Sequence, residues 1–333
     1  MRFTERARGT VWNSSLFLPE KRIRMKLLKI LCTLLGAAAM SGGCIGEDMS
    51  GCPPEMNIRL TFSYRGDTDD PTMFRKMIDR VSLYVFDRES GRHILTKTIE
   101  KNDLQRFEGT RLYLPEGSYR IVSWANAGDD TEILVSGTLA ECRVHAPAYT
   151  SQEHIATNDH LYYGELDLTV PAAVVRRRVN SAAETTGDIP HRSAHINVEV
   201  YTKNFGYKDR PATWPVVEMS GLMPQYDMEM NAVQPFDAVY YPKVVWDSER
   251  DVAAARFAVL RFPDENGISV SIGEPAPGVP AKVAVNLERY MADNNISVDD
   301  KNEVTLRLLF EFTDLGAAVM VPDWKENEVE PDI

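Results

Sequence analysis

The cysteines are the residues of this sequence whose type and placement point most clearly to chemistry. Cys44 ends the run MKLLKILCTLLGAAAMSGGC, which begins at Met25 with basic residues, continues with an apolar stretch over 30–40 and closes with small residues. This order is typical of a secretory signal peptide, because a membrane-spanning helix needs about 20 apolar residues. We therefore predict a signal peptide over 1–43. Residues 1–24 fit no part of such a signal, so the true start is expected at Met25.

Cys44 is the candidate site of a covalent modification. Small residues that end directly at a Cys resemble the bacterial lipobox, in which this Cys becomes the first mature residue and is acylated on its sulfur and its amine. Ser41 departs from that pattern, since Leu is common at its position. Several acyl chains, at about 0.8 kcal/mol per buried CH₂, would hold the protein on a membrane stably. Residues 44–54 would then be a lipidated linker; the alternative is a secreted protein in which Cys44 pairs with another Cys.

Cys52 and Cys142 are the pair left for a disulfide, because Cys32 leaves with the signal peptide and Cys44 is lipidated. In an oxidising compartment they could close a loop of about 90 residues, which would stabilise the fold by roughly 4 kcal/mol if the bond is unstrained. Two free buried thiols are the alternative, and the sequence leaves both open.

The remaining polar residues predict no catalytic or metal site. None of the six histidines stands in a metal-binding spacing such as HExxH, and the sequence has no CxxC pair. No GxSxG elbow, Walker loop or GxGxxG follows a predicted strand. We therefore expect neither enzymatic activity nor a cofactor.

Two weaker candidates are more consistent with ordinary surface roles. Asp67, Asp69 and Asp70 could bind Ca²⁺ through their carboxylates, but the downstream Glu and Gly of an EF-hand loop are missing. A solvated acidic turn is therefore expected. His154 and His160 lie in a loop and are expected on the surface.

Charge separates the start of the chain from the rest and limits its partners. The chain has 37 Lys and Arg against 49 Asp and Glu, a net charge of -12. Residues 1–43 alone contain eight Lys and Arg against two Glu, so the mature part is strongly acidic. A nucleic acid is not expected as a partner, because binding phosphates requires a basic surface. The 333 residues, 44% of them hydrophobic, suffice for about two folded domains.

Hydrophobic and polar residues alternate along most of the mature chain, which predicts strands with one buried face. The clearest strands are 56–64, 81–87 and 303–312, where only Leu309 breaks the polar face. Short helical segments are predicted around 73–80 and 287–292. Two further strands are expected within 112–128, on either side of a Pro-Glu-Gly turn, and the second ends at Trp124. The other expected strands are 93–100, 132–139, 160–170, 195–203, 236–246, 253–262 and 317–324.

Many short strands with turn signals, in two blocks, predict an all-β fold of two tandem β-sandwich domains. The first domain is placed at 55–175 and the second at 193–324, followed by an acidic tail over 325–333. Between the two blocks the alternation breaks into VVRRRVNSAAETTGDIPHR. Its small and polar residues, with a Gly and a Pro, are typical of a connection.

Motifs along nearly the whole mature chain resemble those of one family. The runs between Cys44 and Trp324 are, in order, CIGEDMSGCP, MNIRLTFSY, VSLYVFD, LYLPEGSYRIVSWANAG, HLYYGE, EVTLRLLFEF and VMVPDW. Together they resemble the fimbrial anchor subunits of Bacteroidota, which are related to fimbrillin-A. Residues 204–300 contribute no distinctive motif. Glu47 and Asp48 also resemble the acidic signal that moves lipoproteins of this phylum to the cell surface.

The resemblance implies two transthyretin-like sandwiches in an outer-membrane lipoprotein at the base of a fimbrium, with fimbrillin-type stalk subunits as partners. In this family a stalk subunit loses its first strand, and a C-terminal strand of its neighbour fills the groove by donor-strand exchange. The incoming strand satisfies both the unpaired backbone and the apolar pockets. With Cys44 lipidated, residues 56–64 would stay in their own sheet. The subunit would offer 303–324, or the tail beyond, to the first stalk subunit.

Two other functions remain open. Arg65 ends the first strand, where an arginine-specific protease could cut and release the lipid, which would make the chain a stalk or tip subunit. The second is a surface glycan-binding lipoprotein, since tandem β-sandwiches serve that role too. Trp214, Trp246 or Trp324 would then stack on a sugar, although packing in a core is the commoner fate of such residues.

Overall fold

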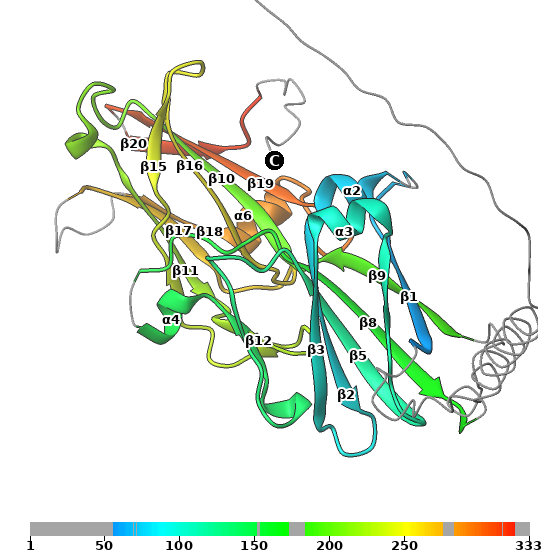
Figure 1. Cartoon of the computed structure of the whole chain (residues 1–333). Helices are drawn as coiled ribbons and strands as arrows, with labels where there is room; N and C mark the ends of the chain where they lie inside the picture. Colours follow the sequence, from blue (N-terminus) through cyan, green and yellow to red (C-terminus); the bar gives the residue numbers. More distant parts are fainter. Residues whose placement is uncertain are drawn as a thin grey trace, which may run out of the picture. The chain divides into compact units, whose positions relative to one another are not determined.

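A computed structural model describes residues 56–68, 70, 72–151, 154–172, 184–275, 283–314 and 316–323. Within these ranges the chain is built mainly of strands, which confirms the all-β prediction (Figure 1). The helical elements are α2 (Met73–Met77), α3 (Lys101–Arg106), α4 (Pro147–Ser151), α6 (Leu287–Asp293) and the 3₁₀ turns η2 (Leu139–Glu141) and η3 (Pro211–Thr213). In the ranges that the structure describes, we find no helix with the length and apolarity needed to span a bilayer.

The first lobe is a sheet of seven strands that encloses its own core. In order across the sheet, the strands are β3 (His93–Glu100), β2 (Arg80–Asp87), β5 (Gly117–Ala125), β8 (Tyr162–Val170), β9 (Thr185–Ser193), β1 (Ile58–Tyr64) and β4 (Gly109–Leu112). β9 joins two layers, because it pairs with β1 along most of its length and with β8 only at Arg192 and Ser193. The core draws on both layers, with Leu60 from one and Leu83 and Ile121 from the other.

The second lobe is a sandwich of two sheets. The larger sheet contains β15 (Val244–Asp247), β16 (Val252–Leu260), β10 (His195–Lys203), β19 (Thr305–Thr313) and β20 (Gly316–Met320). The smaller sheet contains β14 (Ala238–Tyr240), β11 (Val216–Leu222), β17 (Ser269–Gly273) and β18 (Val283–Asn286). Their shared core includes Val198 and Leu308 from the larger sheet, Met219 and Val270 from the smaller one, and Leu287 of α6.

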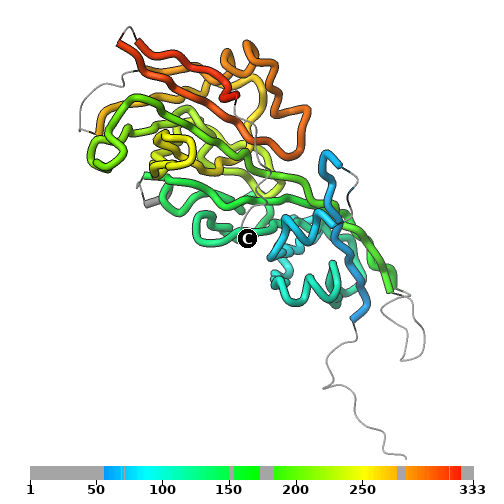
Figure 2. The backbone as a smooth tube through the Cα atoms, turned by 90° about the horizontal axis from the view of Figure 1, so that it is seen from above, coloured from blue at the N-terminus to red at the C-terminus, as the bar shows by residue number. Residues whose placement is uncertain are grey.

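The two lobes are joined by strand rather than by a flexible linker. The segment TTGDIPHRS, which was expected within the connection, is strand β9 of the first lobe. Ala194 alone separates β9 from β10, so the backbone runs almost without interruption from one lobe into the other (Figure 2). Strand β9 tolerates Pro190 because this residue does not have to donate a hydrogen bond. The carbonyl of the next residue, His191, accepts the Arg65 N–H at 2.7 Å, so the backbone of His191 faces β1. Backbone groups of neighbouring residues face opposite edges of a strand, so that of Pro190 faces away from β1.

A third sheet contains strands from both halves of the sequence. It contains β6 (Glu132–Leu134) and β7 (Arg143–His145) from the first half, and β12 (Gln225–Asp227) and β13 (Ala232–Val233) from the second. β7 pairs with β12, and a buried cluster beside them combines Trp124 and Tyr163 with Tyr226 and Met228. The Trp124 Nε1–H donates to the Met228 carbonyl at 3.1 Å. The two halves therefore share a core.

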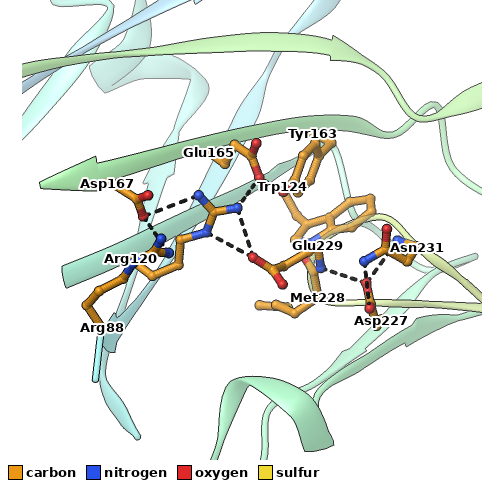
Figure 3. A network of polar contacts seen from close by, with 10 residues as sticks. All are labelled: Arg88, Arg120, Trp124, Tyr163, Glu165, Asp167, Asp227, Met228, Glu229 and Asn231. Carbon is orange, nitrogen blue, oxygen red and sulfur yellow. Dashed lines mark hydrogen bonds and ion pairs between the residues drawn. The ribbon is translucent and has the colours of Figure 1, made fainter. Parts of the chain in front are cut away.

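Polar contacts reinforce the same junction (Figure 3). Arg120 of β5 donates from Nε to Glu229 of the second half at 3.0 Å, and from Nη1 to Asp167 of β8 at 3.3 Å. It also forms an ion pair with Glu165, and Arg88 reaches Asp167 at 2.9 Å. The Arg120 side chain is only 15% exposed, so these ion pairs are screened less than surface pairs.

Several expected elements differ in detail. The strand expected over 236–246 is two strands, β14 and β15, which lie in different sheets with the buried Pro242 between them. The strand expected over 132–139 ends at Leu134. Helix α3 was not predicted, although Leu104 anchors it in the core. Both predicted helices are present, as α2 and α6.

Because the halves share a core, we expect them to unfold in one transition. Tyr226→Phe removes a hydroxyl that donates to the Arg261 carbonyl at 2.8 Å, so the free energy of unfolding should fall by about 1–2 kcal/mol. Calorimetry should show one transition shifted as a whole. Tyr241→Phe is the control, because its hydroxyl bonds to Glu218 nearer the surface, at 2.9 Å. Two separate transitions, only one of them moved, would contradict a shared core.

Candidate functional site: the first strand and the terminal hairpin

β1 is an interior strand. It pairs in parallel with β9 from Ile58↔Thr185 to Tyr64↔His191, and antiparallel with β4 over its first four residues. Its alternation places Ile58, Leu60 and Phe62 in the core, at 0%, 0% and 3% exposure. A strand with partners on both edges offers no open backbone to another chain.

Two glycines let the neighbouring strands approach β1 closely. A Cβ at Gly109 of β4 would lie 2.2 Å from the backbone oxygen of Leu60. A Cβ at Gly187 of β9 would lie 2.4 Å from Leu166 and 3.4 Å from the Leu60 side chain. Any side chain at Gly109 would push the backbone of β4 away from that of β1. A glycine at this position is therefore required for the close pairing of the two strands.

A buried histidine lies under the end of β1. The ring of His191 meets those of Phe62 and Phe74 edge-on, at centroid distances of 5.6 and 5.9 Å. Its Nε2 forms a hydrogen bond of 2.7 Å with the Ser123 hydroxyl. Burial lowers the pKa of His191 to about 4, because the imidazolium would lose its hydration. The ring is therefore neutral at physiological pH and packs as part of the core.

The chain that leaves β1 is tied to the second lobe. Both carboxylate oxygens of Asp67 accept backbone N–H groups, from Asn302 at 2.7 Å and from Glu303 at 2.9 Å. The Tyr64 hydroxyl donates to the Glu303 carboxylate and accepts from the Asn302 amide at 3.1 Å. We call Tyr64, Asp67, Asn302 and Glu303 the clasp. It joins the end of β1 to the residues directly before β19.

The clasp is a partly buried, charge-assisted network. Burial raises the pKa of Glu303, and burial together with the Glu303 hydrogen bond raises the pKa of Tyr64. The phenol therefore keeps its proton and donates it to the carboxylate. Hydrogen bonds to ionised groups are roughly twice as strong as neutral ones, and breaking one leaves a buried charge without its partner.

Arg65, the predicted protease site, lies between Tyr64 and Asp67 of the clasp. Its side chain is exposed, but its N–H donates to the His191 carbonyl at 2.7 Å. A cavity of about 270 Å³ beside it is lined in part by Gly66, Arg261 and Lys301. The Arg261 guanidinium closes one wall by donating to the Asn302 carbonyl at 2.8 Å. The side chain can be reached, whereas hydrogen bonds of Arg65 and Asp67 flank the peptide bond that follows Arg65.

The terminal hairpin is built from β19 and β20. β19 pairs in parallel with β10 and antiparallel with β20 from Leu309↔Met320 to Thr313↔Gly316. The predicted alternation of 303–312 is confirmed, and Leu309, which breaks the polar face, packs with Tyr201 on the opposite side of the sheet from the main core. β20 has no second partner among the described strands, so it is an edge strand. Met320 on its outer face is 39% exposed.

The predicted modification sites fall mostly outside the described ranges. Cys44 and Cys52 lie there, so lipidation and the disulfide stay predictions. Cys142 is a free, fully buried thiol whose S–H donates to the Thr138 carbonyl at 3.3 Å. Burial raises the pKa of this thiol, which makes it unreactive while it stays covered.

The structure gives the acidic turn a role that the sequence did not predict. Asp67 accepts two backbone N–H groups, and the Asp70 carboxylate accepts the Thr72 N–H at 2.8 Å. The carboxylates of this turn therefore bind backbone groups as well as solvent. In the described ranges we find no group of three or more His, Cys, Asp and Glu that could hold a metal ion. His154 and His160 are exposed, as predicted.

Gly109→Ala should weaken the pairing of β4 with β1. The added Cβ collides with the backbone of Leu60, so the free energy of unfolding should fall by about 1–3 kcal/mol in a denaturant titration. Gly267→Ala is the matched control, because a Cβ there meets no atom within 4 Å and should change stability by less than about 0.5 kcal/mol. Equal effects at both positions would show that the close approach is unimportant.

Asp67→Asn should open the chain around Arg65 to proteases. The amide oxygen can accept only one of the two N–H groups. Because these hydrogen bonds are exposed, losing one should cost about 1 kcal/mol and make local opening several-fold more frequent. Mass spectrometry during trypsin digestion would follow the fragment that begins at Gly66. Asp129→Asn, at an exposed position, should leave the rate unchanged. An unchanged rate in Asp67→Asn would mean that the clasp does not protect this bond.

Comparison with solved structures places this fold among proteins of Bacteroides and Porphyromonas. A candidate polysaccharide-binding protein from Bacteroides thetaiotaomicron is 17% identical with a TM-score of 0.61, over 81% of this chain and 97% of that one. A candidate adhesin from Bacteroides ovatus is 16% identical with a TM-score of 0.61, over 80% and 92%. The fimbrial anchor protein Mfa2 from Porphyromonas gingivalis is 14% identical with a TM-score of 0.58, over 80% and 97%. At these identities the likeness shows the fold alone.

Sequence comparison identifies the family. No curated protein matches the chain. The family model for the fimbrillin-A associated anchor proteins Mfa1 and Mfa2 matches residues 49–330, which is most of the chain and both lobes. The chain therefore belongs to the family of fimbrillin-A associated anchor proteins.

Proposed function

We propose that this protein is a lipid-anchored base subunit, which holds a fimbrium on the outer membrane through acylated Cys44 and joins the first fimbrillin-type stalk subunit by β-strand exchange. Its family and its likeness to a fimbrial anchor structure support a cell-surface role in a fimbrium. The observation that supports the anchor role most directly is the position of β1 inside its sheet. This strand begins at Ile58, 14 residues after Cys44, and is paired on both edges and buried.

The strand order suits a subunit under tension. A lipid at Cys44 would pull on the start of β1, and a stalk would pull on the terminal hairpin. β1 pairs in parallel with β9, the chain continues through Ala194 into β10, and β10 pairs in parallel with β19. Force entering at the start of one strand of a parallel pair and leaving at the end of its partner acts along the strands. It therefore loads all hydrogen bonds of the ladder together rather than one after another.

The terminal hairpin is the better candidate for the joining surface. β20 lies at the edge of its sheet, with Ala317 and Val319 half-buried and Ala318 and Met320 exposed, and an edge strand with this alternation can pair with another chain. β1 has the alternation but not the free edge, because it pairs with β9 and β4. The joining segment is therefore assigned to 303–324 or the tail beyond it.

A stalk or tip subunit released by cleavage after Arg65 is the nearest alternative. The exposed Arg65 side chain favours it, whereas the hydrogen bonds on both sides of the bond oppose it. Even after cleavage, β1 would keep its seven paired positions with β9 and its core contacts, and would have to be extracted.

A glycan-binding lipoprotein is less well supported. Trp124 is fully buried and Trp214 and Trp246 are half-buried, so the described residues present no fully exposed Trp for stacking on a sugar. The likeness to a candidate polysaccharide-binding protein shows the fold alone. The family is one of anchor proteins, so the proposal includes no enzymatic activity.

Cys44→Ala should separate the fimbrium from the cell. Without acyl chains the subunit has no stable hold on the membrane, so we expect at least about tenfold fewer attached fimbriae and a matching rise in shed ones, counted by electron microscopy. Cys52→Ala is the control and should keep attachment.

Mass spectrometry of the N-terminus of the surface form tests the same assignment directly. A lipid-modified peptide beginning at Cys44 is the expected result. A mature terminus at Gly66 would reject the anchor in favour of a cleaved stalk or tip subunit. Unchanged attachment after deletion of the gene would favour the glycan-binding function.

A further inference from the structure

β20 covers only half of the edge of β19. The two strands pair from Leu309 to Thr313, although β19 begins at Thr305. Continuing the register from Leu309↔Met320 would set Pro322 opposite Arg307 and Trp324 opposite Thr305. No described strand takes those places, so the first half of β19 forms an edge of its own sheet.

Proline explains where β20 stops. The Asn197 N–H donates to the Val304 carbonyl at 3.0 Å, so even-numbered residues of this segment face β10 and odd-numbered ones face the β20 side. Arg307 therefore presents its backbone to position 322, where proline has no N–H to donate. The Tyr290 hydroxyl of α6 donates to the Arg307 carbonyl instead, at 2.6 Å. The pairing ends at Met320 for a local chemical reason.

A groove lies beside this open edge. It has a volume of about 740 Å³, and its lining includes Val304 and Thr305 of β19, Ile296 and Lys301 of the loop before it, and Val321. Val321 is 41% exposed there. The groove thus lies along an unpaired strand edge, and its wall mixes apolar Ile296, Val304 and Val321 with polar side chains. An added extended strand would pair with the edge and contact those apolar positions.

We propose that residues 324–333, which are Trp324 and the acidic tail, occupy the groove as an added strand and cap the open edge of β19. The described chain ends at Asp323, directly after Val321 and Pro322, which both line the groove. Ten residues remain, and their reach of about 33 Å exceeds the roughly 13 Å spanned by the four residues 305–308. The tail therefore enters the groove without a turn and is long enough to follow it.

Lys301 is the cation that this occupant would meet. The tail contains four carboxylates against one Lys, and the groove is lined by Lys301 and Arg307 as well as by Asp300 and Glu303. Arg307 is paired with Glu199, and Glu303 accepts from Tyr64. In the contacts between described residues, Lys301 is exposed and its ammonium has no ion pair. An acidic cap at a sheet edge also opposes pairing with other acidic copies of the chain. The cap does not depend on the lipid, but it covers the terminal region that the proposed function assigns to joining, so a stalk strand added at this edge would first have to displace it.

Amide hydrogen exchange on the full chain and on a variant ending at Asp323 tests the cap. The Thr305 amide faces the groove, so its exchange should be at least about tenfold faster in the shortened variant than in the full chain. A synthetic peptide of residues 324–333 added to the shortened variant should restore protection. Exchange in β16, which lies across β10 from β19, should stay the same and serves as the folding control.

Lys301→Glu provides a second variant that keeps the chain complete. Replacing this cation of the groove lining with a carboxylate should repel the tail and speed exchange at Thr305 several-fold, while Lys243→Glu, at an exposed position elsewhere, should not. Equal exchange at Thr305 in the full and the shortened chain, or no response to Lys301→Glu, would overturn the proposal. Protection lost in both variants and restored by the peptide supports it, whether or not the surface form proves to be lipidated.

Discussion

The parallel pairing of β1 with β9 is the interaction on which the rest of the structure depends. It places the first described strand between two others, β9 and β4, rather than at the edge of the sheet. Because β9 leads through Ala194 directly into β10, the same pairing fixes where the second lobe begins. β10 then repeats the arrangement by pairing in parallel with β19. Hydrogen-bonded ladders thus connect β1, the first described strand, with β19 of the terminal hairpin.

Around this ladder, the polar groups are arranged to prevent the lobes from separating. The clasp holds the exit of β1 against the entry of β19, and Arg120 reaches Glu229 from the other half of the chain. The Tyr64–Glu303 and Arg120–Glu229 contacts are partly buried, so breaking either leaves a charge without its partner, whereas the Asp67 contacts are exposed and each is modest. The apolar cluster around Trp124 gives the same junction its packing. A protein that must transmit tension gains from a junction of this kind, because no loose linker can extend first.

The alternation of hydrophobic and polar residues predicted most of the strands, but few of the contacts that join the two lobes. Alternation located β1 and β19 because each has one face in a core, and the buried residues of β19 match the expected ones. The same pattern did not predict β9, because its polar residues, with Gly187 and Pro190, are typical of a linker. The strand forms because Gly187 admits its neighbours closely and Pro190 faces an edge without a partner. No local pattern contains either reason.

The sequence by itself determined the all-β class, the strands with one buried face, the likeness to fimbrial anchors and the places where chemistry is expected at Cys44 and Arg65. These follow from properties of neighbouring residues, which periodicity and short motifs express. Only the tertiary structure decided that Asp67 binds the backbone of Asn302 and Glu303, that Leu309 has an apolar neighbour outside the main core, and that β20 stops opposite Arg307. Each of these depends on residues distant in sequence meeting in space, and spacing along the chain does not record such meetings.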